Sequence, residues 1–167
     1  FAVNDMVGYN NQAAYIPISM VNVANITAFQ CDVYLPKGAE IIKVDDEYDI
    51  TFGGRETRTH TISGELQSNG SVRIAAFSSK NSSFSGNDGI IFNLPLSINT
   101  EDQVLTLEIK NIILVDENNA EILCPNVKWN ISVKNLVLGD VNIDGKVSVS
   151  DATSTVSYIL GEIPVPF

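Results

Sequence analysis

The sequence predicts a mainly β protein, an antiparallel two-sheet β-sandwich, followed by a loop rich in oxygen-bearing side chains and one short helix. Two observations predict the sandwich. Apolar and polar residues alternate with a period of two along most of the chain, and clusters of Gly, Asn, Asp and Pro separate the alternating runs. The chain has 167 residues, of which 44% are hydrophobic and 18% charged, so it can bury one core of ordinary size.

The alternation is clearest in five segments, residues 15–20, 29–35, 72–77, 105–110 and 127–134. It is typical of antiparallel strands with one buried and one solvated face, and no helical pattern interrupts it. Turn-forming clusters lie at residues 8–11, 36–38, 53–54, 68–70, 85–89 and 116–119. About nine short strands therefore fit between residues 1 and 135, as expected of an immunoglobulin-like or jelly-roll sandwich.

The charge and the hydropathy pattern argue against several classes of function. Lys and Arg number 10 against 20 Asp and Glu, which gives a net charge of −10. Such a chain repels phosphate backbones and anionic lipid, so we expect no nucleic-acid partner. No apolar run approaches the roughly 18 residues that a transmembrane helix needs, so we expect no membrane insertion.

The two cysteines, Cys31 and Cys124, both lie in apolar, strand-like segments and show no metal-type spacing. A disulfide between them and a pair of free buried thiols both fit the sequence, because the sequence alone cannot bring their Cα atoms within range.

The loop at residues 140–151 is twelve residues long and matches the EF-hand calcium loop. The predicted ligands are Asp140, Asn142, Asp144, the main-chain carbonyl of Lys146, Ser148 through water, and Asp151. Gly145 stands at the sixth position, where the loop must reverse sharply. Ca²⁺ prefers six to eight oxygen ligands, so we predict one Ca²⁺ here, with Asp151 replacing the usual glutamate at the twelfth position.

A short helix follows the loop. Residues 151–160 carry apolar side chains at helical spacing, and Gly161 ends the pattern ahead of two prolines. A helix this short is marginal on its own, so we expect its apolar stripe to pack on the sandwich or on a neighbouring chain.

Residues 139–161 resemble one repeat of a dockerin, including Tyr158, Leu160 and Gly161 near the end of the repeat. Dockerins normally carry two such repeats, and this sequence stops at Phe167, where the second would begin. Either a second repeat lies beyond Phe167 or the protein keeps half a module.

Residues 1–135 resemble a cohesin domain in segments 14–25, 26–35, 69–77 and 105–116. The resemblance implies a cohesin-like jelly roll over residues 1–135 and a dockerin-like repeat, apparently truncated, over residues 136–167. It also implies a protein of a bacterial polysaccharide-degrading system, secreted or held at the cell surface, whose partner carries a dockerin or a cohesin.

The cohesin resemblance further implies a partner-binding face that includes the strands at 27–34 and 71–78. The outward positions there are Gln30, Asp32, Tyr34, Arg73, Ala75 and Phe77. Exposed Phe, Arg and Tyr are typical anchors of interfaces. The alternative is that Phe77 lies under the segment 78–89.

Catalysis is not expected. The single histidine, His60, lies in a plain strand pattern, and the acidic cluster at 45–49 reads as a solvated turn. The rival interpretation is a carbohydrate-binding module, with polysaccharide as the partner, or a surface adhesin with a structural calcium site. Trp129 falls on an apolar side and is predicted to be core, whereas Tyr34, Tyr48 and Phe77 remain as possible sugar platforms.

Overall fold

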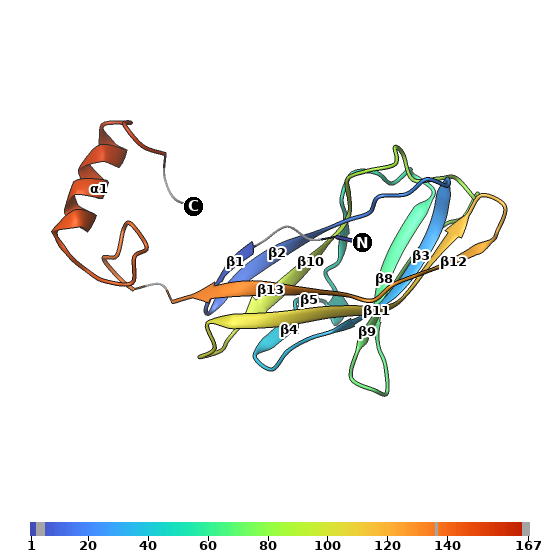
Figure 1. The fold of residues 1–167 in the computed structure, drawn as a ribbon, viewed down its shortest axis with the longest axis horizontal. Coiled ribbons are helices and arrows are strands. Elements are labelled where there is room, and N and C mark those ends of the chain that lie inside the picture. Colours follow the sequence, from blue (N-terminus) through green and yellow to red (C-terminus); the bar gives the residue numbers. More distant parts are fainter. Residues whose placement is uncertain (3–5, 136, 165–167) are drawn as a thin grey trace.

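The computed structural model describes residues 1–2, 6–135 and 137–164. Its elements are β1 (Met6–Tyr9), β2 (Gln12–Ser19), β3 (Ile26–Tyr34), β4 (Ala39–Ile41), β5 (Lys43–Val44), β6 (Glu47–Tyr48), β7 (Thr51–Phe52), β8 (His60–Leu66), β9 (Val72–Ser78), β10 (Ile90–Ile98), β11 (Val104–Asp116), β12 (Glu121–Cys124), β13 (Val127–Lys134) and α1 (Val149–Ile159). Figure 1 shows the strands gathered into one body, with α1 standing beyond the end of β13.

Two main sheets form the body. The larger sheet has the order β1-β13-β11-β3-β9-β8, with β12 paired to β11, and the smaller has the order β2-β10-β4, with β7 paired to β10. Among the described strands, β1 and β13 run parallel and the other pairs run antiparallel. The predicted antiparallel two-sheet sandwich is confirmed, with thirteen strands among the described residues where the sequence pattern indicated about nine.

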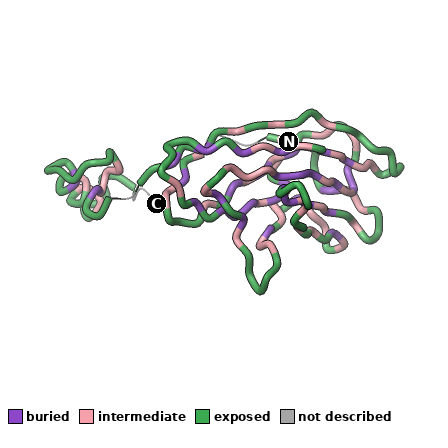
Figure 2. The backbone as a smooth tube through the Cα atoms, turned by 90° about the horizontal axis from the view of Figure 1, so that it is seen from below, coloured by how far each residue is buried: buried purple, intermediate pink, exposed green. Residues whose placement is uncertain are grey.

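The alternating residues of both sheets meet in one hydrophobic core. Its centre is aromatic: Phe29 of β3 stacks on Phe92 of β10 with ring centroids 5.5 Å apart, and Phe1 packs edge-on against both rings. Trp129 also packs against this core, as predicted. Figure 2 shows that the buried residues concentrate in the sandwich.

The segment between β9 and β10 closes one end of the core with Phe84, which is 3% exposed. The ring of His60 stacks on Phe84 with centroids 3.9 Å apart, and its Nδ1 accepts a hydrogen bond from the Thr57 N–H. Burial lowers the pKa of His60. The predicted structural role of this histidine agrees with its place in the core.

The two cysteines are not joined, and the acidic cluster is an exposed turn. Cys31 and Cys124 are both free, and burial raises the pKa of the Cys31 thiol above its usual range. The acidic cluster forms the exposed turn of the hairpin β5–β6, where Asp45 and Asp46 adopt positive φ angles of 50° and 67°. Positive φ at both central residues is the geometry of a two-residue hairpin turn.

The helix α1 begins at Val149, two residues before the predicted start, because Ser148 caps it and Asp151 completes a capping box. Within the described residues it makes no substantial packing contact with any strand. Its apolar stripe stays exposed, with Val156 at 54% and Ile159 at 79%. Of the two arrangements expected for this stripe, packing on the sandwich of the same chain is not found, and packing on a neighbouring chain stays a prediction. The loop after β13 folds on its own hydrogen bonds and carries the helix past the end of the sheets.

One buried arginine ties three loops together. Arg55 is 6% exposed and donates hydrogen bonds to the main-chain oxygens of Met20, Ser85 and Gly86 and to Oδ1 of Asn22, at 2.7–2.8 Å. Because each bond involves a charged donor and a buried or half-buried acceptor, their loss leaves several oxygens without partners.

We expect Arg55→Ala to lower the free energy of unfolding by about 3 kcal/mol, because hydrogen bonds to a charged group contribute more than neutral ones. Chemical denaturation followed by tryptophan fluorescence measures this change. Arg58→Ala is the matched control, since Arg58 is exposed and should cost less than about 0.5 kcal/mol. Equal stability of the two variants would contradict the assigned role.

Candidate functional site

The outer face of the larger sheet divides into two halves. Cross-strand register aligns its outward residues in rows across β8, β9, β3, β11 and β12. We call the first two rows the apolar half. Six of their residues are apolar: Ala28, Ala75, Phe77, Ile113, Val115 and Leu123. The polar members of the same rows are Gln30 in the middle, Thr61 and Ser63 on β8, and Glu121 on β12. The next rows form the polar half, made of Asp32, Tyr34, Arg73, Glu108, Lys110, Asn111 and Lys128.

The apolar half is exposed at its two ends. Phe77 of β9 pairs with Ala28 of β3, which pairs in turn with Val115 of β11. Phe77 is 55% exposed and Leu123 is 77% exposed. The alternative that the 78–89 segment covers Phe77 is therefore wrong, since that segment buries Phe84 instead. Apolar side chains grouped on one face mark a candidate interaction surface.

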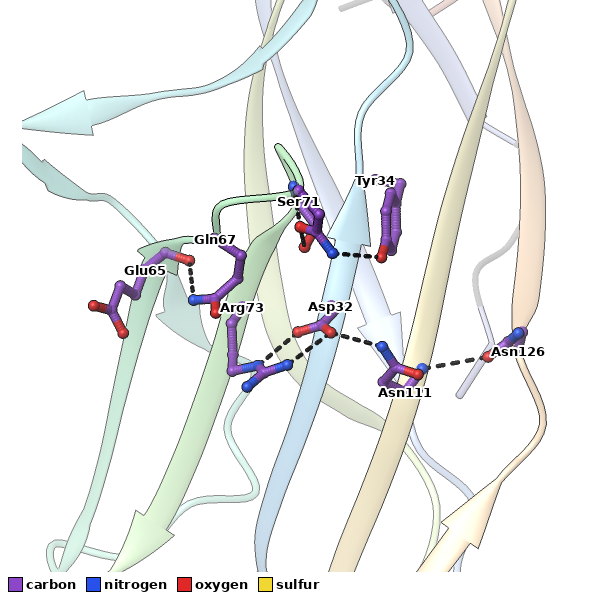
Figure 3. Close-up of polar contacts among 9 residues, drawn as sticks. Asp32, Tyr34, Glu65, Gln67, Ser71, Arg73, Asn111 and Asn126 are labelled. Atoms are coloured by element: carbon purple, nitrogen blue, oxygen red, sulfur yellow. Dashed lines mark hydrogen bonds and ion pairs between the residues drawn. The ribbon is translucent and has the colours of Figure 1, made fainter.

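The polar half centres on the carboxylate of Asp32, which is 1% exposed. Arg73 donates to it in a bidentate pair, Nε to Oδ1 at 2.7 Å and Nη2 to Oδ2 at 2.9 Å, and Asn111 Nδ2 donates to Oδ2 at 2.8 Å. Figure 3 shows Arg73 and Asn111 closing on Asp32 from β9 and β11, on either side of β3. Fork geometry of this kind is the strongest form of an Arg–carboxylate pair.

A bulge in β11 places Asn111. Lys110 pairs with Asp32 and Ile113 pairs with Gln30, so three steps along β11 span two along β3. The extra residue, Asn111, takes a φ of 51°, which asparagine tolerates better than most residues. The bulge also reverses which residues face outward, since Lys110 points out before it and Ile113 after it.

The network sets the charge state of the pair. Hydrogen bonds from Arg73, and then from Asn111, hold the pKa of Asp32 below its ordinary value, against the burial that would raise it. The same contact raises the pKa of Arg73. Both groups therefore stay ionised across the neutral range, and Asp32 is held away from solvent.

The rest of the polar half is tied together in the same way. Tyr34 Oη accepts a hydrogen bond from Asn69 Nδ2 at 3.0 Å, and Lys110 Nζ lies 4.6 Å from the centre of the Tyr34 ring. Glu108 forms ion pairs with both Lys110 and Lys128, and hydrogen bonds from these lysines lower the pKa of Glu108.

All five residues predicted for the partner face lie on this one surface: Gln30, Asp32, Tyr34, Arg73 and Phe77. The exposure of these residues differs. Arg73 and Asn111 cover Asp32, whereas Phe77 is exposed to solvent. Asp32 therefore positions Arg73 rather than offering its own carboxylate to a partner. Sequence reasoning missed Asn111 and Leu123, which lie in segments without a period-two pattern.

The three aromatic residues considered as sugar platforms, Tyr34, Tyr48 and Phe77, do not form one flat binding surface. Tyr34 lies under Lys110, and Tyr48 lies under Lys43, whose Nζ is 4.5 Å from the centre of the ring. Tyr48 belongs to the separate hairpin β5–β6, whereas Phe77 lies in the apolar half of the larger sheet. Tyr34 and Phe77 therefore lie in different halves of one sheet face, and Tyr48 lies apart from both.

The loop at 140–151 is folded around two buried carboxylates. Asp140 is 8% exposed and accepts hydrogen bonds from the N–H groups of Asp144 and Gly145, at 3.1 and 2.7 Å. Asp151 is 3% exposed and accepts from Val141 N–H at 2.8 Å and from Ser148 N–H at 2.6 Å. The bond from Ser148 is the main cause of the lowered pKa of Asp151.

The predicted ligands Asn142 and Asp144 accept main-chain hydrogen bonds within the same turn, from Asp144 N–H at 3.1 Å and from Lys146 N–H at 2.9 Å. As these side chains lie, no three Cys, His, Asp or Glu side chains in the described ranges gather closely enough to hold a metal ion. The carboxylates here have no cationic partner, since the ion pairs found among the described residues all lie on the larger sheet.

Comparison with known proteins relates the sandwich to one fold. No protein-family model matches the sequence, and no curated protein matches it significantly. Solved structures do match. A cohesin module from a family 33 glycoside hydrolase of Clostridium perfringens superposes with a TM-score of 0.64 at 11% identity, covering 81% of this chain and 94% of that one.

Two more cohesins give similar results. A non-cellulosomal cohesin from the archaeon Archaeoglobus fulgidus has a TM-score of 0.62 at 11% identity, covering 84% of this chain and 92% of that one. A chain of a type I cohesin–dockerin complex from Clostridium thermocellum has a TM-score of 0.60 at 15% identity, covering 80% of this chain and 92% of that one. The sandwich therefore has the cohesin fold.

None of the helices in the described part of the chain is long and apolar enough to cross a membrane.

We expect Asp32→Asn to lower the free energy of unfolding at pH 7 by about 2 kcal/mol, which lies between the effects of breaking an exposed and a fully buried ion pair because the Arg73 side chain is 38% exposed. The pKa of Asp32 is lowered in the folded state, so its contribution is present above about pH 4 and is lost as the pH falls through the folded pKa.

Urea unfolding at pH 7 and at about pH 2.5 tests both parts, since the difference between wild type and Asp32→Asn should shrink in acid. Asp46→Asn, in an exposed turn, is the control and should change stability little at either pH. A difference that is the same at both pH values would contradict the ionised pair.

Proposed function

We propose that this chain is a non-catalytic protein–protein interaction module of the cohesin type, which binds a dockerin-bearing partner through the outer face of its larger sheet. The observation that carries the proposal is the apolar half of that face, where Phe77 and Leu123 are open to solvent beside a rigid polar network. The cohesin fold supports it, because one structure of the same fold comes from a cohesin–dockerin complex.

The physical properties of the face suit this role. Exposed Phe and half-exposed Arg and Tyr give large contact areas at small entropic cost, and such residues dominate binding energies. The buried Asp32 carboxylate fixes the Arg73 guanidinium before a partner arrives, so less freedom is lost on binding.

The absence of catalysis is part of the proposal. His60 is the one histidine in the sequence, and it is buried against Phe84 rather than placed in a surface cluster. The carboxylate on the candidate face, Asp32, is held ionised and covered by Arg73, so it suits neither general acid nor general base catalysis.

The proposal includes one Ca²⁺ in the loop at 140–151. The donor set supports it, with Asp140, Asn142, Asp144 and Asp151 as side-chain ligands, the Lys146 carbonyl and Ser148. Buried Asp140 and Asp151 have no cation beside them, and a divalent ion would neutralise the charge that the loop concentrates. Gly145 already has the φ of 87° that the reversal at the sixth position needs.

We place the protein outside the bacterial cell or at its surface, in a system that degrades polysaccharide. The support is indirect: the cohesin module of Clostridium perfringens named above belongs to a glycoside hydrolase. A direct polysaccharide partner is the weaker form of this proposal, because the rings of Tyr34 and Tyr48 are each covered by a lysine.

Phe77→Ala should weaken binding to a type I dockerin by about 2 kcal/mol, roughly 30-fold, because Phe77 is a large, exposed apolar side chain on the proposed face. The melting temperature should hardly change, since the side chain is 55% exposed. Surface plasmon resonance against a panel of immobilised type I dockerins, with thermal unfolding in parallel, measures both.

Tyr15→Ala is the control for Phe77→Ala. Tyr15 is equally exposed, at 58%, but lies on the smaller sheet, so its loss should leave dockerin binding unchanged. Equal effects of both variants, or binding to a glycan array that is lost on removal of Tyr34, would count against the proposed face.

Isothermal titration with Ca²⁺ should show one site in the wild type and none in Asp140→Ala, because Asp140 is the first ligand of the loop. Asp46→Ala removes an acidic side chain outside the loop and should leave the titration unchanged. Equal heats from wild type and Asp140→Ala would reject the calcium site.

A further inference from the structure

The ring of His60 is buried where the segment after β9 folds back over the end of the core. His60 is 8% exposed, and its ring stacks on Phe84 with centroids 3.9 Å apart and meets Phe52 edge-on at 6.2 Å. Phe84 in turn packs against Phe29 of the core, with centroids 5.8 Å apart. The imidazole is therefore part of the aromatic packing that closes this end of the sandwich.

Hydrogen bonds determine which nitrogen of the neutral His60 ring carries the proton. The Thr57 N–H lies 2.9 Å from Nδ1, and a main-chain N–H can only donate, so Nδ1 is the acceptor and the proton is on Nε2. Thr57 Oγ1 also lies 3.0 Å from Nδ1. Nε2 is the one buried side-chain nitrogen or oxygen among the described residues that has no hydrogen-bond partner. The surroundings of the ring therefore suit its neutral form.

A second proton on the ring would break this arrangement. It would bind Nδ1 and point at the Thr57 N–H, which would lose its acceptor. Burial penalises the charged ring and is the main reason why the pKa of His60 lies below its ordinary value. The carbonyls of Thr27 and Ser82 approach the ring and favour the charged form, but neither completes a hydrogen bond with Nε2.

The charged groups near the ring do not compensate a positive charge on it. Glu56 favours protonation of His60, with a smaller effect than burial has. β7 carries no ionisable residue, and the other ionisable residues of the elements around the ring are Asp32, Arg55, Arg58, Glu65, Arg73, Lys80 and Asp88. No carboxylate in the described ranges forms an ion pair with His60, so a charge on this ring would be buried without a counterion.

Two ties of different kinds hold the segment after β9 over the core. Arg55 donates two hydrogen bonds to main-chain oxygens at 85–86, at 2.8 and 2.7 Å, and a guanidinium stays charged throughout the range in which proteins fold. Phe84 is held by its stack on His60 and by its own N–H, which donates to the Ile26 carbonyl at 2.8 Å. Only the second tie includes a group that changes its charge near neutral pH.

We propose that His60 is an acid-sensitive latch: a proton gained at Nδ1 takes the acceptor away from the Thr57 N–H and releases residues 80–84 from the end of the core, while Arg55 keeps residues 85–86 in place. In the open state the His60 ring reaches water and binds its second proton with the ordinary histidine pKa of about 6.5. Because the open state then binds more protons than the closed state, opening is favoured as the pH falls below about 6.5, and the segment stays closed above it.

Hydrogen exchange of single amides, measured by NMR at pH 7.5 and 5.5 and corrected for the intrinsic rates, tests the proposal. The Phe84 N–H reports the latch, because its hydrogen bond to β3 breaks on opening. The Ser85 N–H, which donates to the Arg55 carbonyl at 2.7 Å, is the control on the other tie. The amides of the ladder between β3 and β11 report global unfolding. His60→Asn is the matched variant, because its Oδ1 takes the place of Nδ1 as acceptor and cannot be protonated.

In the wild type, protection of the Phe84 amide should fall by about 3-fold to 10-fold between pH 7.5 and 5.5, since a group with a pKa of about 6.5 is roughly 90% protonated at the lower pH. Protection of Ser85 and of the ladder amides should change by less than about 2-fold. In His60→Asn the Phe84 amide should be less protected at pH 7.5, because the stack is lost, and should show no further loss in acid.

Three exchange results would overturn the proposal: protection of Phe84 that does not depend on pH in the wild type, equal losses at Phe84 and Ser85, or the same acid-induced loss in His60→Asn.

The state of the ring gives a second test that needs no variant. His60 is the one histidine in the sequence, so its ring signals are assigned without ambiguity. Long-range ¹H–¹⁵N spectra at pH 7.5 should show Nδ1 without a proton and Nε2 with one. A neutral ring with its proton on Nδ1, or a ring that titrates at or above the ordinary histidine pKa, would equally overturn the latch.

Discussion

The buried carboxylate of Asp32 is the constraint on which the candidate face depends. A charge that is 1% exposed must be paired, and its three hydrogen bonds come from Arg73 on β9 and Asn111 on β11. A one-residue slip of either neighbour would turn these partners to the other side of the sheet and leave the charge unpaired. The pair therefore fixes the register of three adjacent strands, and the rows of the apolar half follow from that register.

The bulge at Asn111 serves both halves of the face. It supplies the third hydrogen bond to Asp32, and it reverses the alternation of β11 so that Ile113 and Val115 point outward beyond it. A charged cluster and an apolar surface thus share one backbone irregularity.

Local patterns in the sequence predicted much of this face, and long-range placement accounts for what they missed. The strict alternation at 29–35 and 72–77 gave the outward positions of Gln30, Arg73 and Phe77, because a strand's period depends only on neighbouring residues. The burial of Asp32 depends on Asn111, 79 positions away, and the run around the bulge does not alternate. Neither could be predicted from a period of two.

The C-terminal segment is organised by a different kind of interaction from the sandwich. Its order comes from short-range bonds, with Asp151 accepting from Ser148 as part of the helix cap and from Val141 as part of the loop. One carboxylate therefore holds the beginning of α1 against the beginning of the loop. Because these bonds leave the helix stripe free, the segment is ordered while Val156 and Ile159 remain exposed. The sandwich is ordered mainly by its apolar core, whereas the apolar residues of α1 stay exposed and take no part in ordering the segment.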